Sequence, residues 1–358
     1  MSLESKLRLK SKSDSLIEVL KKQTDIPLIV WGMGSMSYNT RKMLAQNGLT
    51  LSAIWIDGER TEKYSDSIPI MSIEQITQRY KKINVVCGHS RYDLVEEAKE
   101  KYPSIKEIYC FVNICYGKWD TISKEFIEKH MDEYESSYKL FSDELSRECF
   151  SAYLNCKNTE DYKILLPCCM ETATYFKNPF FDVSDSEVLL DVGAYNGDTI
   201  KEFVAATEGR YKKILAIEPE KESFEELKEY VSNGHLKNVS LFNNGCWNKK
   251  TTLRFELNEE SSGISDKGIE LDVMRIDEQF KTEMISIIKI NYLSGVEETI
   301  KGAEGILRKN KPKLAIVVGF DEWGIMRIPN LIMQINPEYH LGLRYASPMP
   351  ARLILFAF

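Results

Sequence analysis

The residues best suited to chemistry stand near the middle of the chain, where an apolar run ends in alternating acids and glycines. Residues 187–191 indicate a buried strand, and Asp191-Val-Gly-Ala-Tyr-Asn-Gly-Asp-Thr199 continues from its carboxyl end. Carboxylates here would repel phosphate, but they attract a cationic ligand that bears an amino group. Glycines let the backbone pass close to such a ligand. We therefore predict ligand contacts from this turn, by Asp191, Gly193, Ala194, Gly197, Asp198 and Thr199.

Two more loops follow the next two predicted strands, residues 213–217 and 239–242. The first brings Glu218, whose carboxylate can accept both hydroxyls of a ribose, and the second brings Asn244, in a loop suited to an adenine ring. Open α/β sheets bind ligands at the carboxyl ends of their strands. S-adenosylmethionine combines an adenosine with a sulfonium and an α-ammonium, so we predict it as the cofactor.

A second glycine turn lies near the N-terminus. Gly32-x-Gly34-x-x-Ser37 follows the apolar run 26–31 and opens a helical pattern, and Asp57 ends the next apolar run. Glycines and a helix N-terminus could hold a pyrophosphate, with Asp57 on a ribose, although serine in place of a third glycine loosens the match. Two interpretations stay open: a nucleotide or nucleotide-sugar site at these four residues, or a tight turn without a ligand. An oxidoreductase ranks last, because no proton donor accompanies the turn. His89, without an identifiable partner, is interpreted as a loop residue.

The elements that must position these residues form two α/β regions. Apolar runs of four to six residues alternate with helical patterns, which is typical of buried parallel strands and crossover helices. We predict two Rossmann-like, doubly wound domains, at 1–115 and 181–358. A helical connector at 116–180, rich in charged and aromatic residues, is expected between them.

Composition excludes several classes of protein. The 358 residues carry 47 Lys and Arg against 54 Asp and Glu, a net charge of −7, which disfavours nucleic acid as a partner. No apolar run approaches the roughly 20 residues of a membrane span, and no signal peptide is evident. Eight cysteines without a C-x-x-C pair predict neither a metal site nor a disulfide framework. We expect a cytoplasmic protein without a membrane partner, and apolar surface on the connector helices would support a homo-oligomer.

Residues 170–358 resemble the FkbM-type family of S-adenosylmethionine-dependent methyltransferases. The resemblance rests on the turn 191–199, on Ala216-Ile-Glu-Pro-Glu220, on Asn244-Gly-Cys-Trp-Asn248 and on Lys311-Pro-Lys-Leu-Ala-Ile316. It implies a class I methyltransferase fold with an antiparallel last strand, and O-methylation of a sugar or a small natural product. The N-terminal domain more loosely resembles nucleotide- or sugar-nucleotide-binding modules attached to such enzymes.

The chain departs from the family pattern on the acceptor side. The family's acids after the fourth strand are replaced by Asn291, Leu293 and Val296, its histidine after the fifth strand by Phe320, and an acid before the last strand by Arg352. An amide cannot take a proton at neutral pH, and a general base is typically worth about 10²–10⁴ in rate. Two interpretations follow: a changed acceptor or base, with Asn291, Tyr292 and Tyr345 as catalytic candidates, or a catalytically weak or inactive protein that binds S-adenosylmethionine or a nucleotide.

Overall fold

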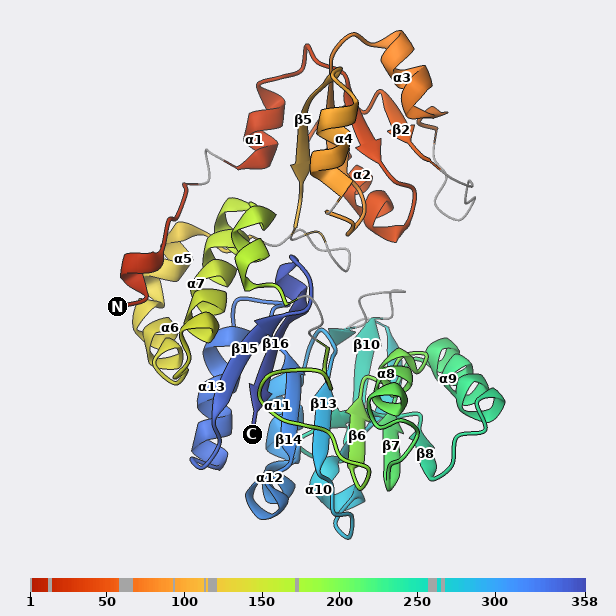
Figure 1. Ribbon diagram of the computed structural model, residues 1–358, viewed down its shortest axis with the longest axis vertical. Coiled ribbons are helices and arrows are strands. Elements are labelled where there is room, and N and C mark those ends of the chain that lie inside the picture. The colour runs from red at the N-terminus through yellow and green to blue at the C-terminus, as the bar shows by residue number, and fades with distance from the viewer. Residues whose placement is uncertain are drawn as a thin grey trace.

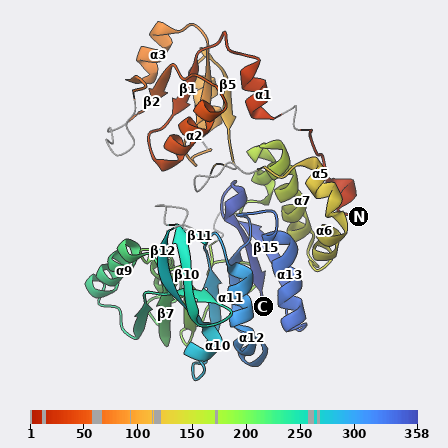
Figure 2. The ribbon, with the colours of Figure 1, turned by 180° about the vertical axis from the view of Figure 1, so that it is seen from behind.

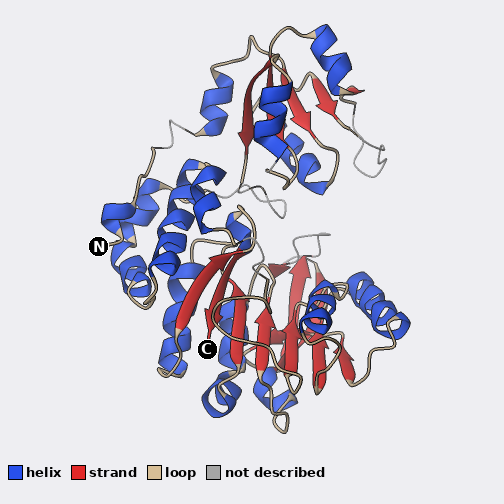
Figure 3. Cartoon of the chain, in the orientation of Figure 1, coloured by secondary structure: helices blue, strands red, loops and turns tan. Residues whose placement is uncertain are grey.

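The computed structural model describes residues 2–11, 15–57, 67–92, 94–112, 114, 121–170, 174–256, 263–264 and 268–358. Two α/β domains lie one above the other, and a group of helices flanks them (Figure 1). Figure 3 shows the same division by secondary structure, with an upper and a lower group of strands and the connector helices beside the lower one. The predicted fold class, two Rossmann-like domains with a helical connector, is confirmed.

The N-terminal domain has a five-stranded parallel sheet in the order β3-β2-β1-β4-β5. Its central strands are apolar and buried along their whole length, because helices cover both faces of the sheet. The strands are β1 (Leu28–Trp31), β2 (Ala53–Trp55), β3 (Ile70–Met71), β4 (Ile83–Cys87) and β5 (Ile105–Cys110). The helices are α1 (Leu16–Lys21), α2 (Ser35–Gln46), α3 (Ile73–Arg79) and α4 (Leu94–Lys101).

The connector packs on the C-terminal domain. It consists of α5 (Lys124–Lys129), α6 (Met131–Tyr138), α7 (Glu144–Thr159) and the 3₁₀ turn η5 (Tyr162–Cys168). Ser146 on α7 accepts a hydrogen bond at Oγ from the backbone N–H of Leu343, at 2.8 Å. Residues 2–11, with η1 (Glu4–Lys6), also lie against these helices, where the N–H of Arg8 donates to Asn155 Oδ1 at 2.7 Å (Figure 1). The first residues of the chain therefore contact the connector, which the predicted boundary at 1–115 did not foresee.

The connector also holds the N-terminal domain. Lys163 on η5 pairs with Glu96 on α4 at 2.6 Å, and the rings of Tyr162 and Tyr92 lie 4.9 Å apart. These contacts place the carboxyl edge of the upper sheet above that of the lower one (Figure 1).

The C-terminal domain has a seven-stranded sheet in the order β15-β16-β14-β13-β6-β7-β8, in which β16 runs antiparallel to both its neighbours. An antiparallel last strand is what the family resemblance implies. The strands are β6 (Val188–Val192), β7 (Lys213–Ile217), β8 (Val239–Phe242), β13 (Ile287–Ile290), β14 (Lys313–Val317), β15 (Leu341–Tyr345) and β16 (Leu353–Ala357). The helices are α8 (Asp198–Ala206), α9 (Lys221–Asn233), α10 (Ile276–Gln279), α11 (Val296–Gly302), α12 (Glu304–Asn310), α13 (Gly324–Ile335) and the 3₁₀ turn η6 (Pro350–Arg352).

A second, four-stranded sheet in this domain was not predicted. It has the order β11-β10-β12-β9 and lies beside the large sheet (Figure 2). Its strands are β9 (Gly245–Trp247), β10 (Thr251–Glu256), β11 (Gly263–Ile264) and β12 (Ile269–Arg275). Exposed Thr and Arg alternate with half-buried residues along β10, so it lacks the continuous apolar run that marks a central strand.

Among the described residues, no helix combines the length and the hydropathy that crossing a membrane requires.

Candidate active site between the two α/β domains

A cavity of about 950 Å³ lies where the carboxyl edges of the two sheets meet. Its volume is near the upper end of the roughly 300–1,000 Å³ of ligand pockets. Loops after β1 and β4 line it from the N-terminal domain, and loops after β6, β7, β8, β13 and β14 line it from the C-terminal domain. The sequence predicted ligand loops at both edges, but not that they share one cavity.

The glycine turn after β6 requires its glycines. Gly193 lines the cavity with φ +76°, and a Cβ there would lie 2.5 Å from the backbone oxygen of Asn291. Gly197 is the N-cap residue of α8, with φ +92°, and a Cβ there would lie 2.6 Å from the ring of Tyr230. Both glycines adopt a left-handed conformation and both are closely packed, so a side chain at either position would be strained and would clash with its neighbours.

Asp191, predicted to contact the ligand, lies below the turn instead. Its side chain is fully buried, and Lys289 on the adjacent strand β13 places Nζ 2.9 Å from Asp191 Oδ1. Burial raises the pKa of Asp191, against the lowering effect of Lys289. Lys289 Nζ also donates to the carbonyl oxygen of Gly193 at 2.7 Å. The expected direct contact is corrected to a supporting role, because the carboxylate is paired beneath the turn and does not line the cavity.

The other predicted cofactor residues divide in the same way. Gly193, Asp198, Glu218 and Asn244 line the cavity. Ala194, Gly197 and Thr199 are buried behind the lining and shape the turn. The backbone N–H of Ala194, for example, donates to the carbonyl of Ile217 at 3.0 Å.

Glu218 is the most distinctive acid of the cavity. Its Oε2 accepts the backbone N–H of Tyr195 at 2.8 Å, and its Oε1 accepts that of Glu220 at 2.9 Å. Only 6% of the residue is exposed, and burial raises the pKa of Glu218 to about 7. Each oxygen accepts one backbone hydrogen bond and has capacity for another, so the carboxylate can receive a pair of hydroxyl donors.

Aromatic side chains that the sequence analysis did not single out also line this part of the cavity. Tyr195, with φ +48° and 48% of its surface exposed, comes from the glycine turn itself. Trp247 follows Asn244 on β9, and Phe255 comes from β10. Trp247 lies within the loop predicted for the adenine ring, at 242–247, whereas no signal pointed to Phe255, because the second sheet was not predicted.

The catalytic candidates have three different environments. Asn291 lines the cavity at the end of β13. Tyr292 lines it too, but its hydroxyl contacts Thr299 Oγ1 and donates to Gly295 O at 3.3 Å, and burial raises its pKa well above the usual 10.0. A hydroxyl so engaged is unsuited to take a proton from an acceptor, so Tyr292 is corrected to a structural residue.

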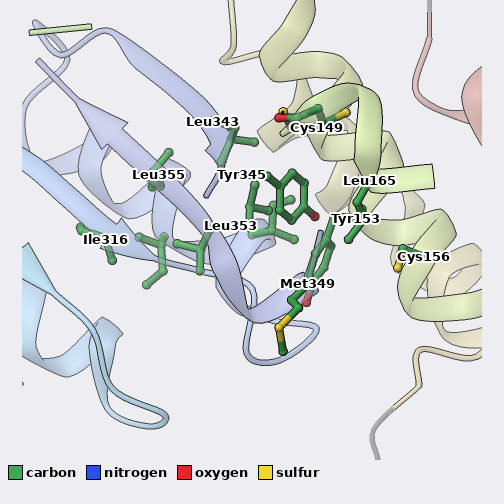
Figure 4. Packing of buried hydrophobic residues seen from close by; sticks show 14 of the residues in the cluster. Cys149, Tyr153, Cys156, Leu165, Ile316, Leu343, Tyr345, Met349, Leu353 and Leu355 are labelled. Carbon is green, nitrogen blue, oxygen red and sulfur yellow. Dashed lines mark hydrogen bonds between the residues drawn. The ribbon is translucent and has the colours of Figure 1, made fainter. Parts of the chain in front are cut away.

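Tyr345 is also corrected. It lies in the hydrophobic core between β15, β16 and α7, packed with Cys149, Tyr153 and Leu353 (Figure 4). The residue is 0% exposed, burial raises its pKa well above 10.0, and it does not line the cavity. Strand β15 is buried along its whole length. Tyr345 is therefore a core residue, and its hydroxyl is not placed to contact a ligand in the cavity.

Of the positions that depart from the family pattern, Leu293, Phe320 and Arg352 line the cavity together with Asn291. Val296 begins α11 and lies outside the lining.

The N-terminal glycine turn is only partly exposed to the cavity. Gly32, with φ +109°, and Gly34 line it. Ser37 is fully buried, and its Oγ donates to Gly32 O at 2.6 Å and accepts from Arg41 at 2.7 Å. The serine therefore fastens the turn and does not face a ligand.

Asp57, predicted as a ribose acceptor, lies outside the cavity lining. Its two oxygens accept the indole N–H groups of Trp55, at 2.6 Å, and Trp31, at 3.2 Å. The two indoles stack with their centroids 4.0 Å apart. Asp57 thus orients a pair of tryptophans, which corrects its expected role.

His89 lines the cavity, although the sequence suggested only a loop residue. Its ring meets Trp31 edge to face at 4.5 Å, and its Nδ1 accepts the backbone N–H of Arg91 at 3.2 Å. Arg91, two positions along the chain, and Met33, from the loop after β1, also line the cavity. His89 follows directly after a strand that ends at this edge of the sheet. That position could have indicated from the sequence that it lines the cavity.

Comparison with known proteins finds similarity to solved structures. No family model matches the chain, and no curated protein matches it. The crystal structure of methyltransferase FkbM from Methylobacillus flagellatus KT is similar over 98% of this chain and 94% of its own, with 17% identity and a TM-score of 0.72. A Streptococcus thermophilus rRNA methylase (15% identity, 49% and 87% covered, TM-score 0.34) and precorrin-6y C5,15-methyltransferase from Geobacter metallireducens GS-15 (11%, 49% and 80%, 0.32) match less. The chain has the fold of methyltransferase FkbM along nearly its whole length.

Proposed function

We propose that this protein is an S-adenosylmethionine-dependent methyltransferase that methylates an oxygen of a sugar or another small natural product. The observation that carries the proposal is Glu218, a buried carboxylate at the end of β7 whose two oxygens each hold one backbone N–H and face the shared cavity. The adjacent glycine turn leaves room for a ligand to lie against its backbone.

The residues present fit the cofactor. Glu218 can accept the two ribose hydroxyls, and Asn244 with Trp247 can border an adenine ring. Gly193 allows the amino-acid portion to approach the backbone, and the Asp198 carboxylate attracts its ammonium group. We call the part of the cavity lined by the loops after β6, β7 and β8 the cofactor half.

When bound, the cofactor would supply a methyl group on a sulfonium: attack by the acceptor oxygen on the methyl carbon would form the C–O bond as the C–S bond breaks, releasing S-adenosylhomocysteine with loss of the hydroxyl proton. The chain's own contribution is to align the two reactants and to exclude water between the domains. Asn291 and Ser294 line the cavity beside the cofactor half, where they can hydrogen-bond a hydroxyl of the acceptor.

The alternative, a binding protein without turnover, is less well supported. The cavity continues beyond the cofactor half to the loops after β1 and β4, which provides a place for an acceptor.

The test is release of S-adenosylhomocysteine by the full chain, incubated with S-adenosylmethionine and a panel of free sugars, nucleotide sugars and hydroxylated natural products. We expect S-adenosylhomocysteine to be released with at least one acceptor, and mass spectrometry to show one added methyl group on that acceptor. Binding of the cofactor without release for any acceptor class would favour the alternative. Loss of cofactor binding would remove both.

A further inference from the structure

The cavity extends well beyond the cofactor half. Its remaining wall comes from the loops after β1 and β4 of the N-terminal domain, from Leu166 on η5, and from residues 347–352 before β16. We call this part the acceptor half. The loops come from both domains, so a ligand held there touches both.

The carboxylates and the arginines of the lining belong to different halves. The lining carboxylates are Asp198, Glu218 and Glu220, and all three belong to the cofactor half. The charged side chains of the acceptor half are Arg91, after β4, and Arg352, at the end of η6, and both residues are exposed. Among the described residues that line the acceptor half, none carries a carboxylate. An anion would therefore be attracted to one half and repelled by the other.

The floor between the halves is neutral where an acceptor would pass. It is formed by Asn291, Leu293, Ser294 and Phe320, together with Tyr292. The cation Lys289 also lines the cavity, where it is paired with Asp191. This stretch therefore places no carboxylate against an anion that lies between the domains.

Guanidinium groups are well suited to phosphoryl oxygens, because their planar array of donors can bind two oxygens at once. Arg91 and Arg352 come from different domains and line the same cavity, so a phosphoryl-bearing ligand that reaches both would contact both domains. The surrounding residues Met33, Met36 and Tyr92 give the same half an apolar surface against which a flat or aliphatic portion can pack.

We propose that the acceptor half binds a phosphoryl-bearing acceptor, such as a nucleotide-linked sugar, through Arg91 and Arg352. This inference rests on the proposed function, because it names the acceptor class of the same enzyme. It assigns the anionic part of the acceptor to the N-terminal side and the methylated oxygen to the floor near Asn291.

The test is calorimetry on the full chain loaded with S-adenosylhomocysteine, with uridine diphosphate, inorganic pyrophosphate and uridine as probes. We expect uridine diphosphate to bind, with an affinity that falls as salt rises. Arg91→Gln and Arg352→Gln should each weaken it about tenfold or more, because each removes charged hydrogen bonds. Arg210→Gln, an exposed arginine paired with Glu208 away from the cavity, is the matched control and should change nothing.

The three probes distinguish the contribution of the phosphoryl groups from that of the nucleoside. Pyrophosphate that binds with the same arginine dependence shows that the phosphoryl groups suffice, and a preference for uridine diphosphate shows that the nucleoside adds contacts. Uridine binding as tightly as its diphosphate would overturn the proposal, as would wild-type affinity in the double arginine variant or absence of binding by both phosphorylated probes.

Failure of the proposed function looks different. In that case S-adenosylhomocysteine itself does not bind, whatever the phosphorylated probes do. The two arginine variants are expected to bind S-adenosylhomocysteine as the wild type does, because neither residue belongs to the cofactor half.

Discussion

Lys289 and Asp191 form an ion pair under the glycine turn, with Nζ 2.9 Å from Oδ1 and both side chains at most 1% exposed. The same Nζ donates to the carbonyl of Gly193 at 2.7 Å. Strands β6 and β13 are thus tied to the backbone that faces the cavity. The pair supports the turn from below, where Asp191 lies outside the cavity lining and Lys289 reaches it.

Breaking this pair should be costly. Lys289→Met leaves an uncompensated buried carboxylate, and we expect a loss of about 3–5 kcal/mol in the free energy of unfolding. Adding Asp191→Asn to that variant should recover part of the loss. The exposed pair of Arg308 and Glu304 is the control, since Arg308→Ala should cost at most about 1 kcal/mol. Urea unfolding measures all three, and a Lys289→Met loss no larger than that of the control contradicts the role given to the pair.

The glycine turn offers a second matched comparison. Gly193 and Gly209 have nearly the same φ, +76° and +74°, but a Cβ at Gly193 would lie 2.5 Å from Asn291 O while one at Gly209 meets nothing within 4 Å. Gly209→Ala should therefore show the backbone cost alone, about 1–2 kcal/mol. Gly193→Ala should lose more stability and weaken S-adenosylmethionine binding at least tenfold. Equal losses in the two variants would show that the close approach at Gly193 has no consequence.

The sequence predicted the framework well because the strands of the two large sheets are continuous apolar runs. Strands β7 and β8 have the predicted bounds, and β1 and β6 differ from the predicted runs 26–31 and 187–191 by up to two residues at an end, whereas β3 and β5 were not predicted. The single helix expected over 297–308 is broken at Ala303 into α11 and α12. The small sheet was missed, since its strands alternate and lie partly exposed.

The site was harder to predict because partners distant in sequence decide what each acid does. Asp191 follows a strand as a ligand acid would, but Lys289, 98 positions later, occupies it. Asp57 is likewise held by the indoles of Trp31 and Trp55. Nothing local distinguishes Glu218, which does face the cavity. The shared cavity depends on how the domains meet, and His89 and Arg91 gain their place only from that contact.

Glu218 should give stability and ligand binding opposite pH dependences. Burial raises its pKa from 4.5 to about 7, so the folded state binds its proton more tightly than the unfolded state does. The resulting stability is fully present below pH 4.5 and is lost as pH rises through about 7. In Glu218→Gln the free energy of unfolding should lack this pH-dependent contribution. Urea unfolding of both proteins between pH 5 and 8 measures the difference.

The affinity for S-adenosylhomocysteine should change in the other direction. The ionised carboxylate is the better acceptor for two hydroxyls, so binding should strengthen as pH rises through about 7 and then level off. Calorimetry at pH 5.5 and pH 8 tests this, with Glu218→Gln as the comparison. A wild-type affinity that is the same at both pH values argues against ribose recognition by Glu218.

Tyr345 should prove dispensable for chemistry. Its hydroxyl is buried and has no hydrogen-bond partner among the described residues. Tyr345→Phe removes this unsatisfied group with little change in shape, so stability should stay the same or rise by about 1 kcal/mol, with methyl transfer unchanged. Thermal unfolding and S-adenosylhomocysteine release check both expectations. A large loss of turnover in a stably folded Tyr345→Phe protein would restore it as a catalytic candidate.

Calorimetric titration of the full chain with S-adenosylmethionine tests the central claim most directly. The account predicts that the wild type binds, and that Glu218→Ala, folded as judged by circular dichroism, binds at least about tenfold more weakly, since two charge-assisted hydrogen bonds are lost. The account is contradicted if the wild type shows no binding at millimolar cofactor, or if the folded variant binds as tightly as the wild type.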